Sequence, residues 1–218
     1  MRFITLVLAG LALFWSTLLI YDSLFPPVST LMAAQLVQLE VPHRRFVPLN
    51  RLSPWLVRGA IAAEDGKFCD HHGVDWESLR KAVTTTLDDP ERAHGASTIT
   101  MQVAKNLFLW PSRSYVRKGM EIPIAIVIDA LWGKRKMMET YLNIAEFGDG
   151  IYGVEAAARS YFHKPANQLS RSEAALLIAA LPNPRSRNAA RPDSYHRSYA
   201  ASIAARAPGV TAGCTARH

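Results

Sequence analysis

The chain has 218 residues, a formal net charge of +7 and a hydrophobic content of 49%. This length suits one domain with a sizeable core and indicates no second domain. The excess of positive charge predicts an anionic partner, namely nucleic acid, a lipid surface or a phosphorylated substrate. The chain has no Cys-x-x-Cys pair and no His/Cys cluster at zinc spacing, which argues against a structural metal.

Residues 1–25 have the pattern of a membrane anchor. No charged residue occurs between Arg2 and Asp22, and a helix over residues 3–21 reaches about the 30 Å of a hydrocarbon core. A cleaved signal peptide and a buried core helix are the alternatives, but residues 26–29 contain no convincing cleavage site. We therefore predict one transmembrane helix in this segment.

The orientation of the anchor predicts the compartment of the remaining chain. The N-terminal amine and Arg2 precede the helix, so the positive-inside rule places the N-terminus in the cytoplasm. Everything after residue 25 then lies on the outer side, where nucleic acid is rarely a substrate. An oxidising compartment permits a disulfide between Cys69 and Cys214, with two unpaired thiols as the alternative.

Helical patterns dominate after the anchor. Residues 26–45 are expected to form a linker with one amphipathic segment at 31–39. From Leu49 onwards no segment shows the sustained alternation of a half-buried strand, so the domain is predicted to be mainly α. The predicted helices cover residues 54–65, 75–87, 98–110, 115–132, 135–146, 152–162 and 171–181.

The last of these helices has a defined start and end. Ser170 and Glu173 form a capping box before its apolar run, and Pro182 follows it. The tail beyond residue 190 is rich in Ala and Arg, and we expect a short helix at 195–206 followed by disorder.

The first polar interruption of the helical pattern is at Glu64, where an apolar helix breaks into a Gly-containing loop. A carboxylate at such a junction can reach a cleft, and a general base on a packed helix keeps its position. A solvated helix end is the alternative, since surface carboxylates are ordinary.

The second interruption follows Gly95. Thr98, Gln102 and Lys105 lie at i, i+4 and i+7 and share one polar face of a helix whose N-terminus could bind phosphate. This face either lines a groove or is the wet side of an ordinary amphipathic helix.

The third interruption is the basic series Arg113, Arg117 and Lys118, followed by Glu121. Glu121 is either an ion-pair partner of Arg117 at i+4 or a second active-site carboxylate that the cations keep ionised. Pro123 predicts a helix start or a kink directly after it.

The fourth interruption covers residues 134–143. The basic triplet at 134–136 is interpreted as a solvated face. Met137, Met138, Tyr141 and Leu142 form a core stripe, and Glu139 and Asn143 lie on the opposite face.

Taken in order, these stretches resemble the sequence blocks of the peptidoglycan glycosyltransferases, glycosyltransferase family 51, and most closely its monofunctional, membrane-anchored members. The resemblance covers about residues 45–188, and the residues after 188 match no block of the family. The matching blocks are Glu64-Asp-x-x-Phe68-x-x-His71-x-Gly73-x-Asp75, Gly95-x-Ser97-Thr98-Ile99-Thr100-Met101-Gln102, Arg117-Lys118-x-x-Glu121, Glu139-x-Tyr141-Leu142-Asn143, and Glu173-Ala-Ala-Leu176 to Leu181-Pro182-Asn183-Pro184.

The resemblance implies a lysozyme-like, mostly helical glycosyltransferase domain over residues 46–190, with a membrane-proximal hydrophobic subdomain around 107–132. The anchor 1–25 and the linker 26–45 precede this domain, and the tail 191–218 follows it. Such a protein polymerises lipid II into peptidoglycan strands on the outer face of the cytoplasmic membrane, with inversion at the anomeric carbon. Its implied partners are lipid II, the growing strand, the membrane and other cell-wall synthases that cross-link the strands.

The resemblance also implies residue roles. Glu64 is the general base that deprotonates the GlcNAc 4-hydroxyl of the acceptor, and Glu121 assists the leaving group. A divalent cation, Mg²⁺ or Mn²⁺, is the candidate cofactor, and no organic cofactor is expected. Asp65, His71 and Asp75 are interpreted as structural or supporting. The implied substrate- and pyrophosphate-binding residues are Ser97, Thr98, Gln102, Lys105, Asn106, Arg113, Arg117 and Lys118.

Two other functions fit part of the pattern. A lysozyme-like hydrolase or lytic transglycosylase also uses a glutamate on a helical domain, but it needs no pyrophosphate site, so the cations between residues 105 and 118 favour the polymerase. A non-catalytic, membrane-tethered scaffold of cell-wall assembly is the second rival. The presence of every candidate catalytic side chain argues against it.

Overall fold

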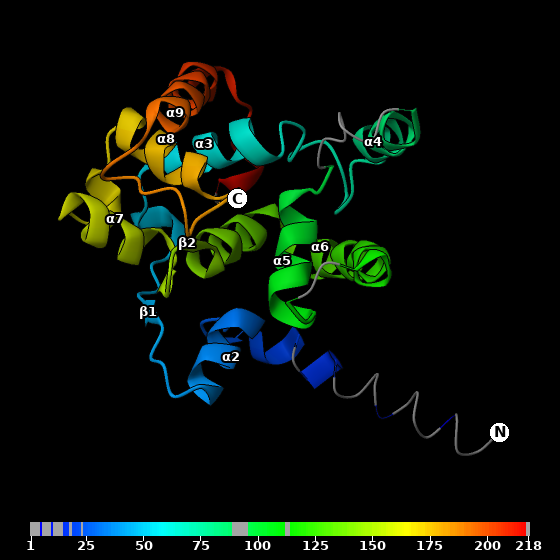
Figure 1. The fold of residues 1–218 in the computed structure, drawn as a ribbon. Helices are drawn as coiled ribbons and strands as arrows, with labels where there is room; N and C mark the ends of the chain where they lie inside the picture. The colour runs from blue at the N-terminus through cyan, green and yellow to red at the C-terminus, as the bar shows by residue number, and fades with distance from the viewer. Residues whose placement is uncertain are drawn as a thin grey trace.

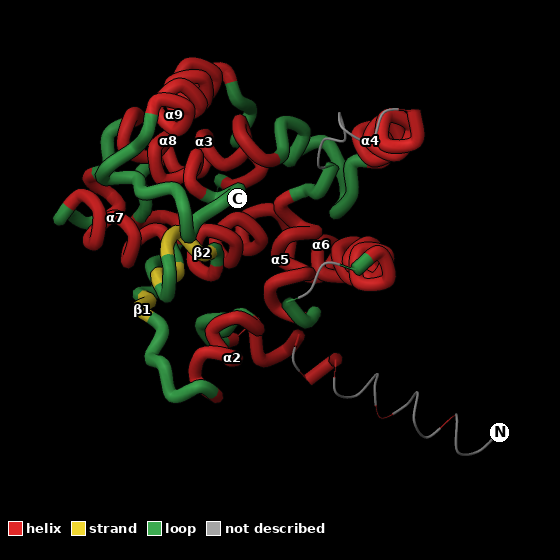
Figure 2. Tube along the Cα trace, viewed as in Figure 1, coloured by secondary structure: helices red, strands yellow, loops and turns green. Residues whose placement is uncertain are grey.

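The structure is a computed structural model that describes residues 15–17, 19–22, 24–88, 96–111 and 114–216, together with Thr5 and Gly10. Helices make up most of the described chain and the strands are very short (Figure 2), so the prediction of a mainly α domain is confirmed.

The helices and strands follow one another along the chain as shown in Figure 1. The α-helices are α2 (Thr30–Val37), α3 (Pro54–Glu64), α4 (Trp76–Asp88), α5 (Ile99–Phe108), α6 (Tyr115–Ile144), α7 (Val154–Phe162), α8 (Arg171–Ala180) and α9 (Ser194–Arg206). The strands are β1 (His43–Arg44), β2 (Glu146–Gly148) and β3 (Ile151–Tyr152), and 3-10 turns lie at η1 (Leu49–Arg51), η3 (Ala166–Gln168), η4 (Ala207–Gly209) and η5 (Gly213–Thr215).

Every helix predicted between residues 54 and 206 is present, with ends within two residues of the prediction. The predicted helices 115–132 and 135–146 form the two halves of α6, which meet at Gly133, where φ is 69° and ψ is 169°. Glycine adopts this left-handed region without steric cost, so the break falls there. The helix runs on through Pro123, which therefore does not mark a helix start. The capping box of Ser170 and Glu173 is confirmed.

The short sheet was not predicted from the sequence. Its strand order is β1-β3-β2, with β1 parallel to β3 and β2 antiparallel to β3. Strands of two or three residues are too short to show an alternating pattern. The sheet joins the segment after α2 to the helical body, because His43 is paired with Ile151.

The helices pack in two groups that share one core. In one group α8 packs against both α3 and α9, and in the other α5 packs against α6, while α4 stands at the edge of the molecule (Figure 1). The core contains Phe68, Met101, Tyr141 and Leu56, each less than 2% exposed. The C-terminal end of α3 lies beside α5, which carries the second polar stretch, because Gln102 of α5 is hydrogen-bonded to Glu64.

The tail differs from its prediction. The expected helix is α9, but the expected disorder after Arg206 is wrong for residues 207–216, which form η4 and η5. A disulfide joins Cys214 to Cys69, 145 residues earlier in the chain, and Arg135 donates a hydrogen bond to the Thr215 carbonyl oxygen. Contacts this distant in sequence leave no local pattern from which order could be predicted.

The predicted transmembrane helix lies largely outside the described residues. Among those that the structure describes, no helix is both long enough and apolar enough to cross a membrane. The linker helix is present as α2, which begins at Thr30 after the capping side chain of Ser29 and buries Met32, whereas its apolar residues Leu36 and Val37 are exposed.

Candidate active site

Glu64 is the last residue of α3 and lines a pocket of about 220 Å³ together with Asp65, Lys67, Asp75, Ser78, Gly66 and residues 96–98. Gln102 on α5 donates a hydrogen bond from Nε2 to Glu64 Oε2 at 2.8 Å. Burial raises the pKa of the Glu64 carboxyl, an effect that the Gln102 hydrogen bond and the nearby Lys105 charge partly offset. The carboxylate is thus placed in a cleft as predicted.

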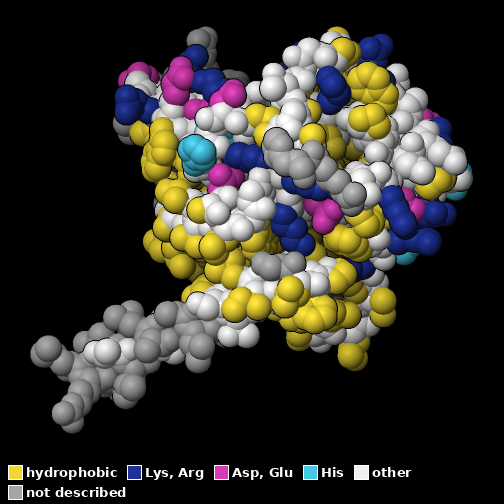
Figure 3. All heavy atoms as spheres, turned by 180° about the vertical axis from the view of Figure 1, so that it is seen from behind, with side chains coloured by type: hydrophobic (Ala, Val, Ile, Leu, Met, Phe, Trp, Pro, Cys, Tyr) yellow, Lys and Arg dark blue, Asp and Glu magenta, His cyan; other side chains and the backbone are white. Residues whose placement is uncertain are grey.

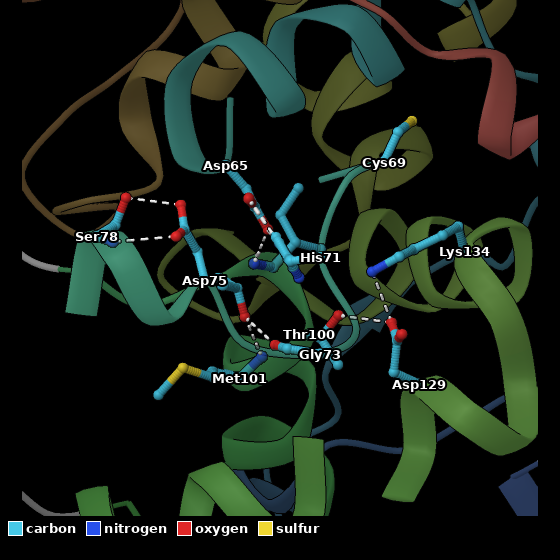
Figure 4. A network of polar contacts seen from close by, with 12 residues as sticks. Asp65, Cys69, His71, Gly73, Asp75, Ser78, Thr100, Met101, Asp129 and Lys134 are labelled. Carbon is cyan, nitrogen blue, oxygen red and sulfur yellow. Dashed lines mark hydrogen bonds and ion pairs between the residues drawn. The ribbon is translucent and has the colours of Figure 1, made fainter. Parts of the chain in front are cut away.

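The loop after Glu64 is attached to α5 by Asp65. Both Asp65 carboxylate oxygens lie 3.0 Å from Nε2 of His71, and Oδ2 also accepts a hydrogen bond from the Ile99 amide at 2.9 Å (Figure 4). Asp65 and His71 are 7% and 9% exposed. Asp75 caps α4 through the Ser78 amide at 3.0 Å. These contacts agree with structural roles for all three residues.

Thr98 connects the start of α5 to the same loop. Its hydroxyl donates to the Gly73 carbonyl oxygen at 2.6 Å and accepts from the Met101 amide at 3.1 Å (Figure 4). Gly73 has a φ of +82°, and a Cβ there would lie 2.6 Å from the Ala125 carbonyl oxygen. The loop is therefore pressed between α5 and α6, and the Thr98 hydroxyl is already occupied within the protein.

Glu121 lies in the basic cluster that the third stretch predicted. Only 2% of it is exposed. Arg117 Nη1 lies 2.7 Å from Oε1, and Lys118 Nζ lies 2.7 Å from Oε2. Lys118 also donates to the Ser97 hydroxyl, which joins Ser97 to the cluster. Arg113, the remaining member of the predicted series, lies outside the described residues.

A second pocket, of about 340 Å³, lies between α5 and the start of α6 and contains both apolar and cationic side chains. Burial lowers the pKa of Lys105, while the Glu121 and Glu64 charges oppose this shift and the Arg117 and Lys118 charges add to it. Lys105 is therefore within electrostatic reach of both carboxylates. The pocket is lined by Thr30, Leu31, Lys105, Asn106, Leu109, Trp110, Pro111 and Arg117.

The predicted divalent cation finds no donor set in the described part of the chain, where no three His, Cys, Asp or Glu side chains come together. Glu121 supplies one carboxylate, and each of its two oxygens accepts from a cationic side chain. These residues do not fit a metal ion, and the metal stays an untested prediction.

The fourth stretch carries contacts that its sequence pattern did not reveal. Glu139 Oε2 accepts from the Leu49 amide at 2.7 Å, and Asn143 binds both the amide and the carbonyl oxygen of Val47. The interpretation of residues 134–136 as a solvated face is wrong for Lys134, whose Nζ lies 2.8 Å from the buried Asp129 (Figure 4). These side chains join segments far apart in the sequence.

One supporting residue was predicted only as core. The Tyr141 hydroxyl lies 3.5 Å from Oε1 of Gln102, and the residue is 1% exposed. Burial raises its pKa well above the usual value, with the Glu64 charge adding to the effect. Tyr141 therefore stays protonated and borders the side chain that orients Glu64. A tyrosine in an otherwise aliphatic stripe was the available signal.

Comparisons with known proteins show what the whole chain is similar to. A family model described as "Transglycosylase" matches residues 31–207. A biosynthetic peptidoglycan transglycosylase of Agrobacterium fabrum is 52% identical over 190 residues, which cover 86% of this chain and 84% of that protein. Proteins of the same name from Rhodospirillum centenum and Escherichia coli are 50% and 46% identical over 93% and 90% of this chain, and over 88% and 85% of their own lengths.

Proposed function

The chain belongs to the transglycosylase family, as a peptidoglycan glycosyltransferase of cell-wall synthesis, and on this premise we propose that it polymerises lipid II into glycan strands. The observation that carries the proposal is that two carboxylates with opposite kinds of partner, Glu64 with the Gln102 amide and Glu121 with two cations, both act electrostatically on Lys105. Glu64 has a neutral partner, the Gln102 amide, and can take a proton. Glu121 is paired with Arg117 and Lys118, cations that can also face a pyrophosphate.

Glu64 is the proposed general base. Its pKa is raised by burial, so the ionised form is a stronger base than an exposed glutamate, and Gln102 orients it. Glu64 takes the proton of the acceptor GlcNAc 4-hydroxyl as that oxygen bonds to the anomeric carbon of the growing chain. The bond from this carbon to the pyrophosphate oxygen breaks, the configuration inverts, and undecaprenyl pyrophosphate leaves with the electron pair.

The basic side chains of the second pocket are the proposed pyrophosphate site. Lys105 and Arg117 line this pocket, and Glu121 holds Arg117 and Lys118 in place through contacts of 2.7 Å. Fixed cations stabilise the charge that develops on the leaving oxygen at the moment it forms. Glu121 then assists departure by organising cations rather than by transferring a proton.

The remaining predicted binding residues divide into two groups. Asn106 and Gln102 present side chains that are only partly buried, which suits contact with the donor sugars. Ser97 and Thr98 have hydroxyls engaged with Lys118 and Gly73, so we assign them to shaping the groove wall. Arg113 remains a proposed phosphate contact.

A lipid-linked substrate requires a membrane-facing surface. Val116, Ile126, Val127 and Leu131 of α6 are between 42% and 71% exposed. Hydrophobic side chains gather along the lower part of the face in Figure 3, towards the N-terminal segment. We propose that this surface contacts the outer leaflet and that the apolar N-terminus anchors the chain there.

The proposal extends to the compartment of the catalytic domain. The single-pass topology, with the N-terminus in the cytoplasm and the domain outside, is supported by the disulfide, because such bonds persist in oxidising compartments. Other cell-wall synthases that cross-link the product are the further proposed partners.

The deciding experiment incubates the full-length chain in detergent micelles with labelled lipid II and separates the products by size. Long glycan with release of undecaprenyl pyrophosphate supports the proposal. Shortening of preformed strands would instead support the hydrolase, and no turnover by a folded protein would support the scaffold.

A further inference from the structure

The segment formed by residues 207–216 lies at and beyond the end of the family match at residue 207. We propose that this segment is a clamp that positions the catalytic loop, residues 65–73, and through it Glu64. The inference rests on the proposed function, because it concerns how the base is held for the transfer. The relatives' shared name does not assign such a role.

The clamp is attached to the rest of the protein at three places. Cys214 is disulfide-bonded to Cys69 within the catalytic loop. Arg58 on α3 donates to the carbonyl oxygens of Pro208 at 3.0 Å and Val210 at 3.3 Å. Arg135, just after the break in α6, donates a hydrogen bond to the carbonyl oxygen of Thr215 at 3.1 Å. The clamp thus connects the loop to α3 and α6.

The catalytic loop sets the distance between two functional helices. It leaves α3 directly after Glu64, binds the first amide of α5 through Asp65, and receives the Thr98 hydroxyl on the Gly73 carbonyl oxygen. Glu64 in turn accepts its hydrogen bond from Gln102 on α5. A shift of the loop would therefore change the separation of Glu64 from its partner.

The inner side of the loop is held by these polar contacts, whereas Cys69 is on its outer side. In Figure 4 the Cys69 side chain points away from Asp65 and His71, toward the C-terminal segment. Around it Gly66, Lys67 and Asp70 are exposed, and Cys69 itself is partly buried. Among residues 66–70 only Phe68 is fully buried. The disulfide is thus the covalent restraint on this half of the loop.

The clamp does not line the pocket that contains Lys105 and Arg117. Its release should therefore lower the rate of transfer and leave lipid II binding nearly unchanged. The test compares the wild-type full-length chain with the double variant Cys69→Ser/Cys214→Ser in the same micelles. We expect kcat to fall by about tenfold, as misplacement of a catalytic group predicts, and KM to stay within about twofold.

A stability control separates positioning from general loosening. Leu169→Ala removes a buried side chain after η3, and the cavity that it leaves should lower the melting temperature by about as much as the loss of the disulfide does. Assays run below the unfolding transition of both variants, checked by circular dichroism. If the double variant keeps the wild-type kcat, or loses no more than Leu169→Ala, the clamp does not position the base.

Two further arms keep the inference testable. Dithiothreitol should reproduce the loss in wild type, with two free thiols found by alkylation, and should leave the double variant unchanged. Arg135→Gln keeps the disulfide and removes one attachment, and should lower kcat by about twofold to threefold at constant KM. An unchanged kcat in both arms would overturn the clamp, whereas absence of glycan from oxidised wild type would overturn the proposed function itself.

Discussion

Glu64 and Glu121 lie on different helices but share Lys105 as an electrostatic neighbour, and their surroundings are opposite. Glu64 accepts one hydrogen bond from a neutral amide, and burial raises the pKa of its carboxyl. Glu121 is 2% exposed and each of its oxygens contacts a cation at 2.7 Å. A carboxylate with a neutral partner can accept a proton, whereas one held by two cations serves to place those cations.

This difference separates a group that performs chemistry from a group that organises a binding site. An ionised carboxylate in the Glu64 environment costs stability and gains basicity. At Glu121 the ionised carboxylate instead stabilises the fold, because removal of the anion would leave two cations uncompensated. Substitution of either glutamate by glutamine should therefore affect stability with opposite signs.

The largest expected effect is that of Glu64→Gln on activity. Loss of the general base should lower kcat in the lipid II assay by at least about 10²-fold, while the same change at the exposed Glu40 should leave kcat within about twofold. A Glu64→Gln protein with wild-type polymerisation would contradict the central assignment.

The same variant should be more stable than wild type at neutral pH. The folded-state pKa of Glu64 is raised above the ordinary value of 4.5, so the protonated form favours folding. Wild type and variant should match below the unfolded-state pKa, and wild type alone should lose stability as the pH rises through the folded-state pKa. Thermal melts at a series of pH values measure this difference.

Glu121→Gln should lower both stability and activity. Loss of the anion from a buried pair costs about 3 kcal/mol, which corresponds to a melting temperature lower by about 6–12 °C for a chain of this size. The kcat/KM for lipid II should fall by about tenfold or more, because Arg117 and Lys118 lose their common partner. A rise in melting temperature would remove the contrast with Glu64.

The pH profile should be bell-shaped, with one limb from Glu64 and the other from its electrostatic neighbour Lys105. Protonation of Glu64 ends activity on the acid side, and deprotonation of Lys105, whose pKa burial lowers, ends it on the alkaline side. Lys105→Arg should remove the alkaline limb and keep kcat/KM at neutral pH within about tenfold of wild type, since an arginine stays charged. An unchanged alkaline limb in this variant would assign it to another group.

The smallest expected effect concerns the orienting residue. Gln102→Met removes the hydrogen bond that lowers the Glu64 pKa, so the acid limb should move to higher pH and kcat at neutral pH should fall about twofold to fivefold. Gln168→Met, an exposed change of the same kind, should move neither. A shift of the acid limb to lower pH would show that Gln102 does not favour the ionised base.

The positions of the helices and of Glu64 could be predicted from local sequence alone. Helical periodicity, the capping box at Ser170 and the Gly-containing loop after Glu64 each act over a few residues, because hydrogen bonds within a helix join residues four apart. The family blocks then indicated which carboxylates to consider. Arg117 and Lys118 as partners of Glu121 followed from the same short spacing.

Tertiary structure alone decided which distant side chains meet. The Cys69–Cys214 bond spans 145 residues, and the contact of Asn143 with Val47 spans 96. Pairs so far apart depend on how packed helices are placed, a property that no window of local sequence contains. The same limit hid Gln102 as the partner of Glu64 and the order of residues 207–216, since both depend on contacts that form only when α3, α5 and α6 come together.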